Sequence, residues 1–312
     1  MSDLGSYLAK HAEAPVANVI LALAGAASAI AAEIRMPATA LDATAGSVNA
    51  DGDTQKKLDV IADEIVLEAL HGTGAAAYLS EERDEVVPID PDGGLVIACD
   101  PLDGSSNIGV NVSVGTIFSV LSAGGGQLQP GRAQLAAGFF VYGPQTTLLL
   151  STGAGTASFR MDDEGSFVII TKDVRIPAEA SEFAINASNR RHWPAPIIRY
   201  VDGCLAGADG PRGHDYNMRW VASLVAETWR ITSRGGVFLY PADARKGYGS
   251  GRLRLVYEAA PVAMLVEQAG GRATDGMRDI LDITPDDLHQ RVPLVFGAAD
   301  EVAAVAAEFV SG

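Results

Sequence analysis

The chain has 312 residues, of which 48% are hydrophobic and 20% are charged, and its formal net charge is −16. This composition is typical of a soluble globular protein with a large core, in one or two domains. The negative charge argues against a nucleic acid or an anionic membrane as partner. Only Cys99 and Cys204 occur, without metal-binding spacing, so we expect a cytoplasmic protein without disulfides.

The N-terminal part predicts two helices separated by a loop. Residues 15–32 carry no charge, but they are rich in Ala and Gly and follow Glu13, so they predict a buried helix rather than a membrane span or signal peptide. Residues 38–55 are small and polar, and they predict a mobile loop that contains Asp53 and can close over a site. Apolar residues at helical spacing predict an amphipathic helix over 56–70, with Asp59 on its first turn.

Most of the predicted strands lie in the first half of the chain, and a second α/β section begins near residue 183. Apolar runs and turn residues predict strands at 75–79, 95–99, 112–121, 136–142 and 146–150, then a hairpin of 156–161 and 167–171. The second section predicts a helix over 215–232, strands at 237–240 and 253–257, and helices over 256–269 and 300–309. We therefore expect two α/β regions, 1–178 and 179–312.

The most informative segment is 100–107, which reads Asp-Pro-Leu-Asp-Gly-Ser-Ser-Asn at the end of an apolar strand. The carboxylates of Asp100 and Asp103, with the Leu102 carbonyl between them, suit a hard, oxygen-loving cation. The N–H groups and hydroxyls of Gly104, Ser105 and Ser106 suit a phosphate. The alternative is an Asp- and Gly-rich surface turn, which is common after strands.

Other acids also stand where apolar elements begin or end. These acids are Asp53, Asp59, Glu81, Glu82 and Glu258. Such an all-oxygen ligand set selects Mg²⁺ or Mn²⁺ over Zn²⁺, and two or more ions can clamp a phosphoryl group and its attacking water. Cations for an anionic substrate come from the second half, where Arg219, Arg252 and Arg254 are candidates, with Asn186, Tyr240 and Tyr257 as neutral donors. Each of these, taken singly, could instead be a surface or packing residue.

Together these motifs resemble class I fructose-1,6-bisphosphatase, within the inositol-phosphatase-like superfamily of metal-dependent phosphatases. The matching segments are 52–59, 80–82, 100–107, 236–241 and 253–258. The resemblance runs from about Asn18 to the C-terminus. It implies a layered α-β-α-β-α sandwich with mixed sheets, of the α/β (α+β) class. It also implies hydrolysis of the 1-phosphate of fructose 1,6-bisphosphate, in gluconeogenesis or the Calvin cycle.

The resemblance also implies a role for each site residue. It implies magnesium ligands at Glu81, Asp100, the Leu102 carbonyl, Asp103 and Glu258, with Asp53 a further ligand when the loop closes. Asp59 and Glu82 would orient and deprotonate the attacking water. The reacting phosphate would lie on Asp103, Gly104, Ser105 and Ser106, and the sugar with its 6-phosphate on Asn186, Tyr240 and Arg252. Arg219 would reach that phosphate from a neighbouring subunit, which implies a homo-oligomer, commonly a tetramer.

The sequence departs from the family pattern at two places. Arg252 and Trp220 stand where gluconeogenic members usually have Lys and Tyr, which leaves sedoheptulose 1,7-bisphosphate open as an alternative or additional substrate. The AMP-inhibition pocket lacks its usual side chains, so we expect weak or absent AMP inhibition; the departures there are Ala14, Val16, Gly94 and Leu95. A catalytically silent sugar-phosphate sensor is a different class of function, but it would be expected to have lost one of the acids.

Overall fold

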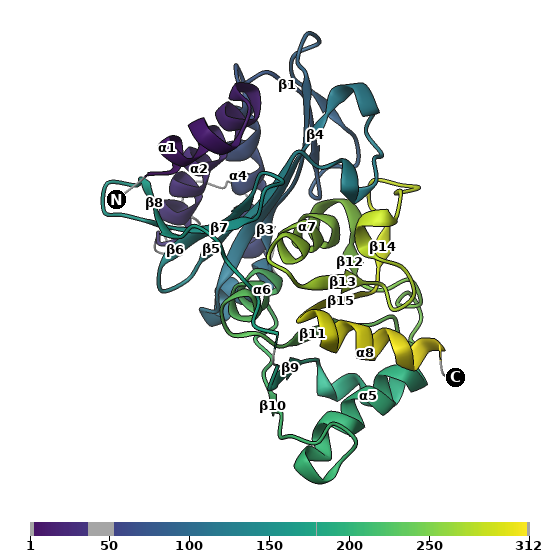
Figure 1. Cartoon of the computed structure of the whole chain (residues 1–312). Helices are drawn as coiled ribbons and strands as arrows, with labels where there is room; N and C mark the ends of the chain where they lie inside the picture. The colour runs from purple at the N-terminus through teal and green to yellow at the C-terminus, as the bar shows by residue number, and fades with distance from the viewer. Residues whose placement is uncertain (1–2, 37–52, 179, 311–312) are drawn as a thin grey trace.

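The computed structural model of the chain describes residues 3–36, 53–178 and 180–310, and its elements form five layers (Figure 1). A layer of three helices covers one face of an eight-stranded sheet. Two helices lie between this sheet and a second, five-stranded sheet, and two further helices cover the outer face of the second sheet. The predicted α-β-α-β-α sandwich with mixed sheets is thus confirmed.

The first helical layer consists of α1 (Leu4–His11), α2 (Ala14–Ile34) and α4 (Asp53–Leu70). The predicted buried helix is α2, which is long and apolar enough to cross a membrane, although half of its most apolar window is buried inside the protein. Helix α4 begins at Asp53, so this residue starts the helix rather than lying in a loop, and Asp59 lies in the second turn instead of the first. The rest of the predicted loop, 38–52, lies outside the described residues.

The large sheet has the strand order β2-β1-β3-β4-β5-β6-β7-β8. Its strands are β1 (Ala75–Ser80), β2 (Val87–Pro88), β3 (Leu95–Asp103), β4 (Val114–Ser122), β5 (Ala136–Tyr142), β6 (Thr146–Ser151), β7 (Thr156–Met161) and β8 (Phe167–Thr171). Only the β1–β3 pair is parallel. Every residue of β5 is buried, because helices cover both faces of the sheet, and this explains its continuous apolar sequence.

The middle layer contains α6 (Leu224–Arg234) and α7 (Ala260–Gln268). The prediction of a helix from residue 215 was wrong, because β10 (Asn217–Met218) pairs with the second sheet and the Ser223 side chain caps α6 by accepting from the Ala226 N–H. The predicted strand 253–257 is also shorter. It ends as β12 (Leu253–Arg254), and a π-helical turn over Leu255–Ala259 then leads into α7.

The second sheet has the order β10-β9-β11-β15-β13 and is covered on its outer face by α5 (Ala195–Leu205) and α8 (Ala299–Val310). Its remaining strands are β9 (Glu182–Ala184), β11 (Val237–Tyr240), β13 (Arg272–Thr274) and β15 (Leu294–Gly297), and β12 pairs separately with β14 (Arg291–Val292). The sequence did not predict α5, β13 or β15.

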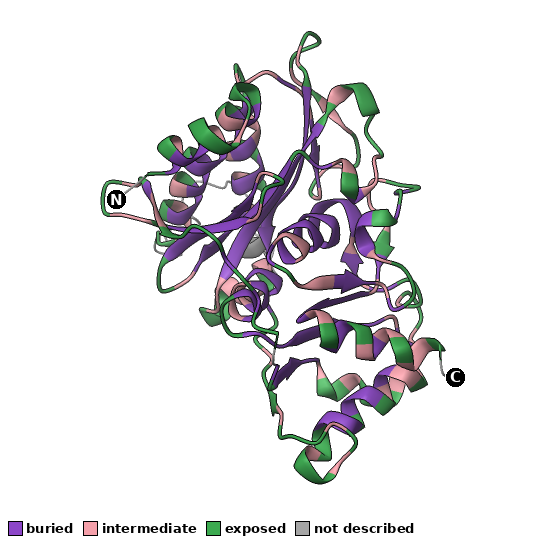
Figure 2. Cartoon of the chain, in the orientation of Figure 1, coloured by how far each residue is buried: buried purple, intermediate pink, exposed green. Residues whose placement is uncertain are grey.

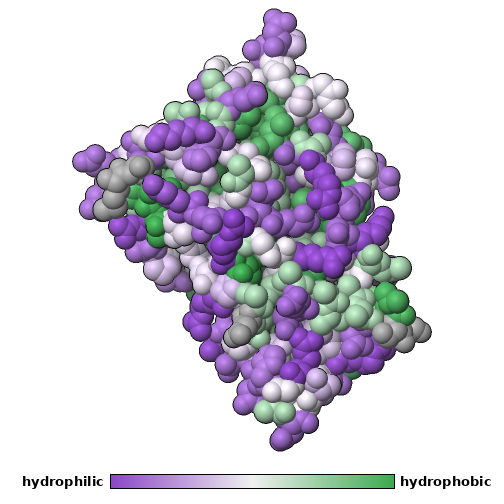
Figure 3. Space-filling model, in the orientation of Figure 1, coloured by the Kyte–Doolittle hydropathy of each residue, from purple (hydrophilic) through white to green (hydrophobic). Residues whose placement is uncertain are grey.

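Burial follows these layers, with buried residues along both sheets and on the helix faces that meet them (Figure 2). The core between the sheets joins residues from both halves of the chain, such as Phe139 of β5 and Val262 of α7. The predicted division at 178/179 therefore separates two sheets that share one core, and as a domain boundary it stays a prediction. Hydrophilic side chains cover much of the face shown in Figure 3, as expected for a protein of net charge −16.

The close contact of β4 with α6 predicts that Gly115 tolerates no side chain. A Cβ at this position would overlap the Phe140 carbonyl and approach Cγ2 of Val225 to 2.7 Å. We expect Gly115→Ala to lower the free energy of unfolding by about 1–3 kcal/mol, measured by denaturant unfolding. Gly25→Ala is the matched control, because a Cβ on this exposed residue of α2 meets open space and should raise stability by about 0.5–1 kcal/mol. Equal stability of the two variants would contradict the prediction.

Candidate active site

Three carboxylates from separate elements converge at one edge of the large sheet. They belong to Glu81 after β1, Asp100 in β3 and Glu258 in the π-helical turn, and one oxygen of each lies within 4.8 Å of the others. Asp100 is 4% exposed and Glu258 7% exposed. Three buried or half-buried acids at this spacing could hold a divalent cation.

The β1–β3 pairing explains why the first two acids meet. The two strands are parallel, with Ser80 opposite Cys99, so Glu81 and Asp100 follow at the same edge. The Glu81 N–H donates to the Cys99 carbonyl at 3.0 Å, which extends the ladder by one bond. Glu258 reaches this edge because the π-helical turn packs against β3 and β4, and its carboxylate accepts from the Arg254 N–H.

The Asp100–Asp103 segment lies beyond the strand end that the sequence predicted at residue 99, but it belongs to β3. Strand β3 continues through it with a shift in register against β4, and the Leu102 N–H donates to Oδ1 of Asp100 at 3.0 Å. The Thr116 hydroxyl donates to the Pro101 carbonyl at 2.7 Å, which fixes the irregular stretch. Any ligand role of the Leu102 carbonyl stays a prediction.

The turn comes at Gly104, whose φ of 74° lies in the left-handed region that favours glycine. A 3₁₀ helix over Ser105–Val110 follows, so Ser105 and Ser106 form its first turn. This helix is tied to the segment before α6, because the Asn107 side-chain amide donates to the Ala222 carbonyl at 2.8 Å.

Asp103 lies on the other side of Gly104, against the start of α6. Its Oδ2 accepts from the Val225 N–H at 3.1 Å, and the residue is 7% exposed. The N-terminus of a helix favours a negative charge, so α6 stabilises the ionised carboxylate in part. Burial has the larger effect and raises the pKa of Asp103 to about 7, with Glu81 adding to the rise.

The two other buried acids of the cluster also have raised pKa values. Burial raises the pKa of Asp100 and of Glu258 well above the usual range, and the Glu81 carboxylate nearby raises both further. A cation among these oxygens would favour their charged forms. The donor set is entirely oxygen, which fits Mg²⁺ or Mn²⁺.

Asp59 and Glu82 flank the acidic cluster. Burial raises the pKa of Asp59 to about 6; a hydrogen bond from Ser105 opposes the rise and Glu81 adds to it. Burial, followed by repulsion from Asp59 and Glu81, raises the pKa of Glu82 to about 7. Oδ1 of Asp59 is buried and has no hydrogen-bond partner within the described part of the chain. A buried acceptor of this kind suits a water or a hydroxyl group.

Two of the three predicted sugar-phosphate residues, Asn186 and Tyr240, lie at the ends of strands of the second sheet, whereas Arg252 lies just before β12. Asn186 follows β9 and Tyr240 ends β11, and because these strands are parallel both residues lie at one edge. The Arg252 guanidinium lies over the rings of Tyr240 and Tyr248, at 5.6 and 4.3 Å from their centroids. Asn186 itself accepts from the Ser188 N–H at 3.2 Å and caps a short 3₁₀ helix.

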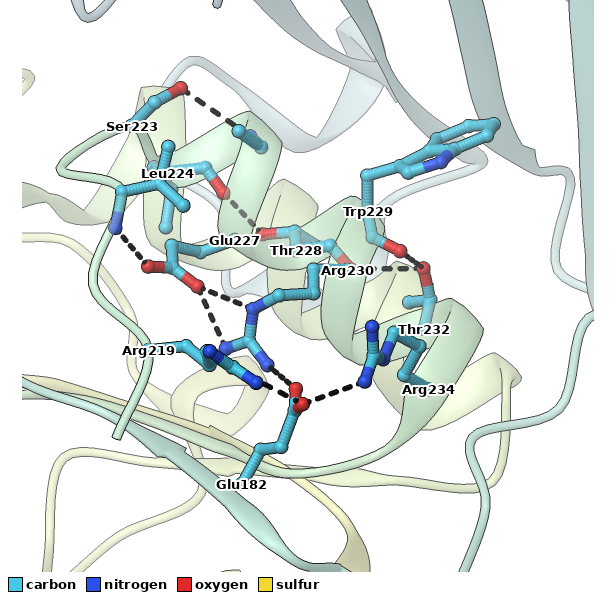
Figure 4. Close-up of polar contacts among 12 residues, drawn as sticks. Glu182, Arg219, Ser223, Leu224, Glu227, Thr228, Trp229, Arg230, Thr232 and Arg234 are labelled. Atoms are coloured by element: carbon cyan, nitrogen blue, oxygen red, sulfur yellow. Dashed lines mark hydrogen bonds and ion pairs between the residues drawn. The ribbon is translucent and has the colours of Figure 1, made fainter. Parts of the chain in front are cut away.

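Arg219 lies in the segment between β10 and α6 and not on the predicted helix. Its Nε lies 3.5 Å from the carboxylate of Glu182, which also binds Arg230 and Arg234 (Figure 4). The Arg219 side chain is 52% exposed, in contrast to 15% for Arg230, which bridges Glu182 and Glu227. Of the three arginines on Glu182, Arg219 thus makes the longest contact, and it is more exposed than Arg230 although less exposed than Arg234.

Two residues near the acids carry contacts that the sequence did not reveal. Arg254, considered above only as a phosphate ligand, lies with its Nε 3.3 Å from Oε1 of Glu81. Asp63 was not predicted at all, although it follows Asp59 by four residues and so shares its helix face. That spacing was the only available signal.

Trp220 packs on the ring of Phe238, with their centroids 5.9 Å apart.

Comparison with known proteins places this arrangement in context. The model of the fructose-1-6-bisphosphatase N-terminal domain matches residues 6–172, and that of the C-terminal domain matches residues 176–309. A class 1 fructose-1,6-bisphosphatase of Bradyrhizobium sp. (strain BTAi1 / ATCC BAA-1182) is 55% identical over 94% of this chain and 88% of its own length. One from Rhizobium meliloti (strain 1021) is 56% identical over 93% and 86%. The crystal structure of Leishmania major fructose-1,6-bisphosphatase in holo form superposes with a TM-score of 0.89 at 32% identity, covering 99% of both chains.

The raised pKa values predict how pH affects the stability of the metal-free protein. Asp59, Glu82 and Asp103 have folded-state pKa values of about 6, 7 and 7, above those of an unfolded chain. The folded protein therefore binds more protons than the unfolded one between roughly pH 4 and pH 7, so its stability falls as pH rises through this range. We expect the thermal midpoint in EDTA to fall from pH 5 to pH 8.

Divalent metal should remove most of this loss, because it stabilises the ionised carboxylates. Thermal midpoints in Mg²⁺ would be compared with those in Na⁺ at equal ionic strength. A metal-free midpoint that rises with pH over this range, or an equal response to Mg²⁺ and Na⁺, would contradict the assignment.

Proposed function

This chain belongs to the fructose-1,6-bisphosphatase family and is a phosphoric monoester hydrolase that acts on fructose 1,6-bisphosphate, and we propose that it removes the 1-phosphate at the Glu81–Asp100–Glu258 cluster. The observation that carries the proposal is the convergence of these oxygens within 4.8 Å, beside the Gly104-Ser105-Ser106 turn. An acidic cluster alone repels a phosphate, whereas the same cluster with bound cations attracts one.

The residues fit a site for two or more magnesium ions. Glu81, Asp100 and Glu258 would hold them, with the Leu102 carbonyl and Asp103 as further ligands and Asp53 as an additional one. When bound, such ions supply Lewis-acid chemistry and neutralise phosphate charge. Mn²⁺ has similar ligand preferences and could replace Mg²⁺.

The protein groups divide the remaining work. Asp59 and Glu82 would orient the attacking water and accept its proton, and the raised pKa of Glu82, about 7, suits a base near neutral pH. Ser105 and Ser106 would hold the reacting phosphate with their hydroxyls and N–H groups, because they form the first turn of the 3₁₀ helix after Gly104.

The sugar and its distal phosphate would lie on Asn186, Tyr240 and Arg252. The stacking of Arg252 on Tyr240 and Tyr248 supports this role, because aromatic contacts fix the guanidinium group in place without neutralising its charge. Arg219 would reach the distal phosphate of a neighbouring subunit, and its half-exposed side chain supports a homo-oligomer, which we propose is a tetramer.

Several finer assignments complete the proposal. Arg252 and Trp220 leave sedoheptulose 1,7-bisphosphate as the alternative substrate, alone or in addition. We propose a cytoplasmic enzyme of gluconeogenesis or carbon fixation, supported by two buried free cysteines. The 1–178 region would carry the metal site, to which Glu258 is added from the 179–312 region, and the 179–312 region would carry the sugar-phosphate site. Weak AMP inhibition is expected from Ala14, Val16, Gly94 and Leu95.

One assay tests the proposed substrate and metal together. Phosphate release from fructose 1,6-bisphosphate and from sedoheptulose 1,7-bisphosphate is measured with Mg²⁺, with Mn²⁺ and in EDTA. We expect turnover of the six-carbon substrate only with a divalent cation. If kcat/KM for the seven-carbon substrate lies within about tenfold of the value for the six-carbon substrate, hydrolysis of the seven-carbon substrate is established as a second activity. Undiminished turnover in EDTA would contradict the metal site.

A second test addresses the two residues assigned to the water. Asp59→Asn and Glu82→Gln should each lower kcat by ~10²-fold or more and leave KM for fructose 1,6-bisphosphate within a few-fold, because a general base acts mainly in the transition state. Glu68→Gln is the control, since Glu68 is an exposed acid on α4 itself. Near-normal turnover of either variant would remove the role assigned to that residue.

A further inference from the structure

Asp63 is a buried acid that the proposed reaction does not use. It lies on α4 one turn after Asp59, so the two carboxylates project from the same face of the helix. Asp63 is 4% exposed. A buried carboxylate is stable only if it is paired or fully hydrogen-bonded, so its partners show what it holds in place.

Within the described part of the chain, the hydrogen-bond partners of the Asp63 carboxylate come from β1 and the turn that follows it. Oδ1 accepts from the Ser80 hydroxyl at 2.6 Å and from the Tyr78 hydroxyl at 2.9 Å. Oδ2 accepts from Nε of Arg83 at 2.6 Å. Asp63 thus binds residues on both sides of the Glu81–Glu82 pair, and through them it joins α4 to the end of β1.

Ser80 carries this connection one step further, to Glu82. Its hydroxyl donates its proton to Asp63 and accepts from the Glu82 N–H at 3.2 Å. Ser80 is 1% exposed, so water does not compete for these bonds. The backbone of Glu82 is therefore placed by a chain of two hydrogen bonds that begins on Asp63.

Arg83 is held from two directions, which closes the turn. Besides Asp63, its guanidinium binds Oε1 of Glu64 at 2.6 Å, also on α4. Its carbonyl lies 3.0 Å from Nε2 of His289, which approaches from the C-terminal half. The turn from Ser80 to Arg83 is thus fixed at its start by the serine and at its end by the arginine.

From this geometry we infer that Asp63 is a positioning residue, which sets the place of Glu82 relative to Asp59 by way of Ser80. The inference rests on the proposed function, in which Asp59 and Glu82 act together on the attacking water. Asp59 lies on one face of α4, and one turn later the same face carries Asp63, whose carboxylate fixes Glu82 by way of Ser80. A displacement of about 1 Å in such a group can cost ~10²-fold in rate.

A double-mutant cycle tests whether Asp63 acts through Ser80. Asp63→Ala, Ser80→Ala and the double variant are prepared in the full chain with Mg²⁺, and kcat, KM and thermal midpoint are measured. We expect each single variant to lower kcat about 10–100-fold and the double variant to lose no more than the worse single one. KM should stay within threefold, and calorimetric binding of fructose 6-phosphate should be unchanged.

Two further variants separate positioning from stability. Asp63→Asn keeps an oxygen that accepts from Ser80, so it should recover kcat to within about fivefold of the original chain. Tyr78→Phe removes a different hydrogen bond to the same carboxylate oxygen. It should lower the thermal midpoint, while kcat stays within twofold. If Asp63→Ala does not fold, the question is decided by the fall in kcat of Ser80→Ala, compared with the unchanged kcat of Tyr78→Phe.

Specific results would overturn the inference. One such result is that the losses of the two single variants multiply in the double variant. Another is that kcat simply follows the thermal midpoint across all variants, including Tyr78→Phe. A third is a normal kcat for Ser80→Ala. The proposed function fails separately: if Glu82→Gln is fully active, Glu82 has no role and positioning it has no meaning. If Glu82→Gln is inactive while Ser80→Ala and Asp63→Ala are normal, only the inference about Asp63 is wrong.

Discussion

The mutual repulsion of buried carboxylates is the constraint on which the rest of the structure depends. The pairing of β1 with β3 and the π-helical turn bring Glu81, Asp100 and Glu258 to within 4.8 Å, and burial together with the nearby Glu81 carboxylate raises the pKa of Asp100 and of Glu258. Such an arrangement stores unfavourable energy unless a cation is present. Burial of apolar side chains in the two large cores on either side of the main sheet offsets this unfavourable free energy.

The donors around the cluster show how the protein controls this repulsion without removing it. Backbone N–H groups of Leu102, Val225 and Arg254 each bond one carboxylate, which fixes its orientation and leaves oxygens available for a metal. Asp59 differs, because its buried Oδ1 has no partner among the described residues. Asp100, Asp103 and Glu258 are thus fixed in orientation, while Oδ1 of Asp59 would be available, in the proposed reaction, to a group that arrives with the substrate.

The sequence predicted the parts of the structure that depend on local pattern. The bounds of β5, β7, β8 and β11 agree with the apolar runs, and three predicted acids that follow such runs, Glu81, Asp100 and Glu258, converge in the structure. The start of α6 was missed because it depends on pairing at a sheet edge, and the π-helical turn at Glu258 because it depends on packing against β3. Asp63 was missed for a related reason: its partners come from β1, so nothing in its own helix shows that it is buried.

The two phosphates of the proposed substrate would be bound in two different ways on a protein of net charge −16. At one end, acids would attract the phosphate only by way of metal ions. At the other, Arg252 lies on two tyrosine rings and forms no ion pair with a carboxylate within the described ranges, so its charge stays available. Arg219, by contrast, shares Glu182 with two other arginines, and three guanidinium groups around Glu182 and Glu227 leave a local excess of positive charge. If both phosphates bind as proposed, selectivity for a bisphosphate would follow, because a ligand with one phosphate can make only one of these two interactions.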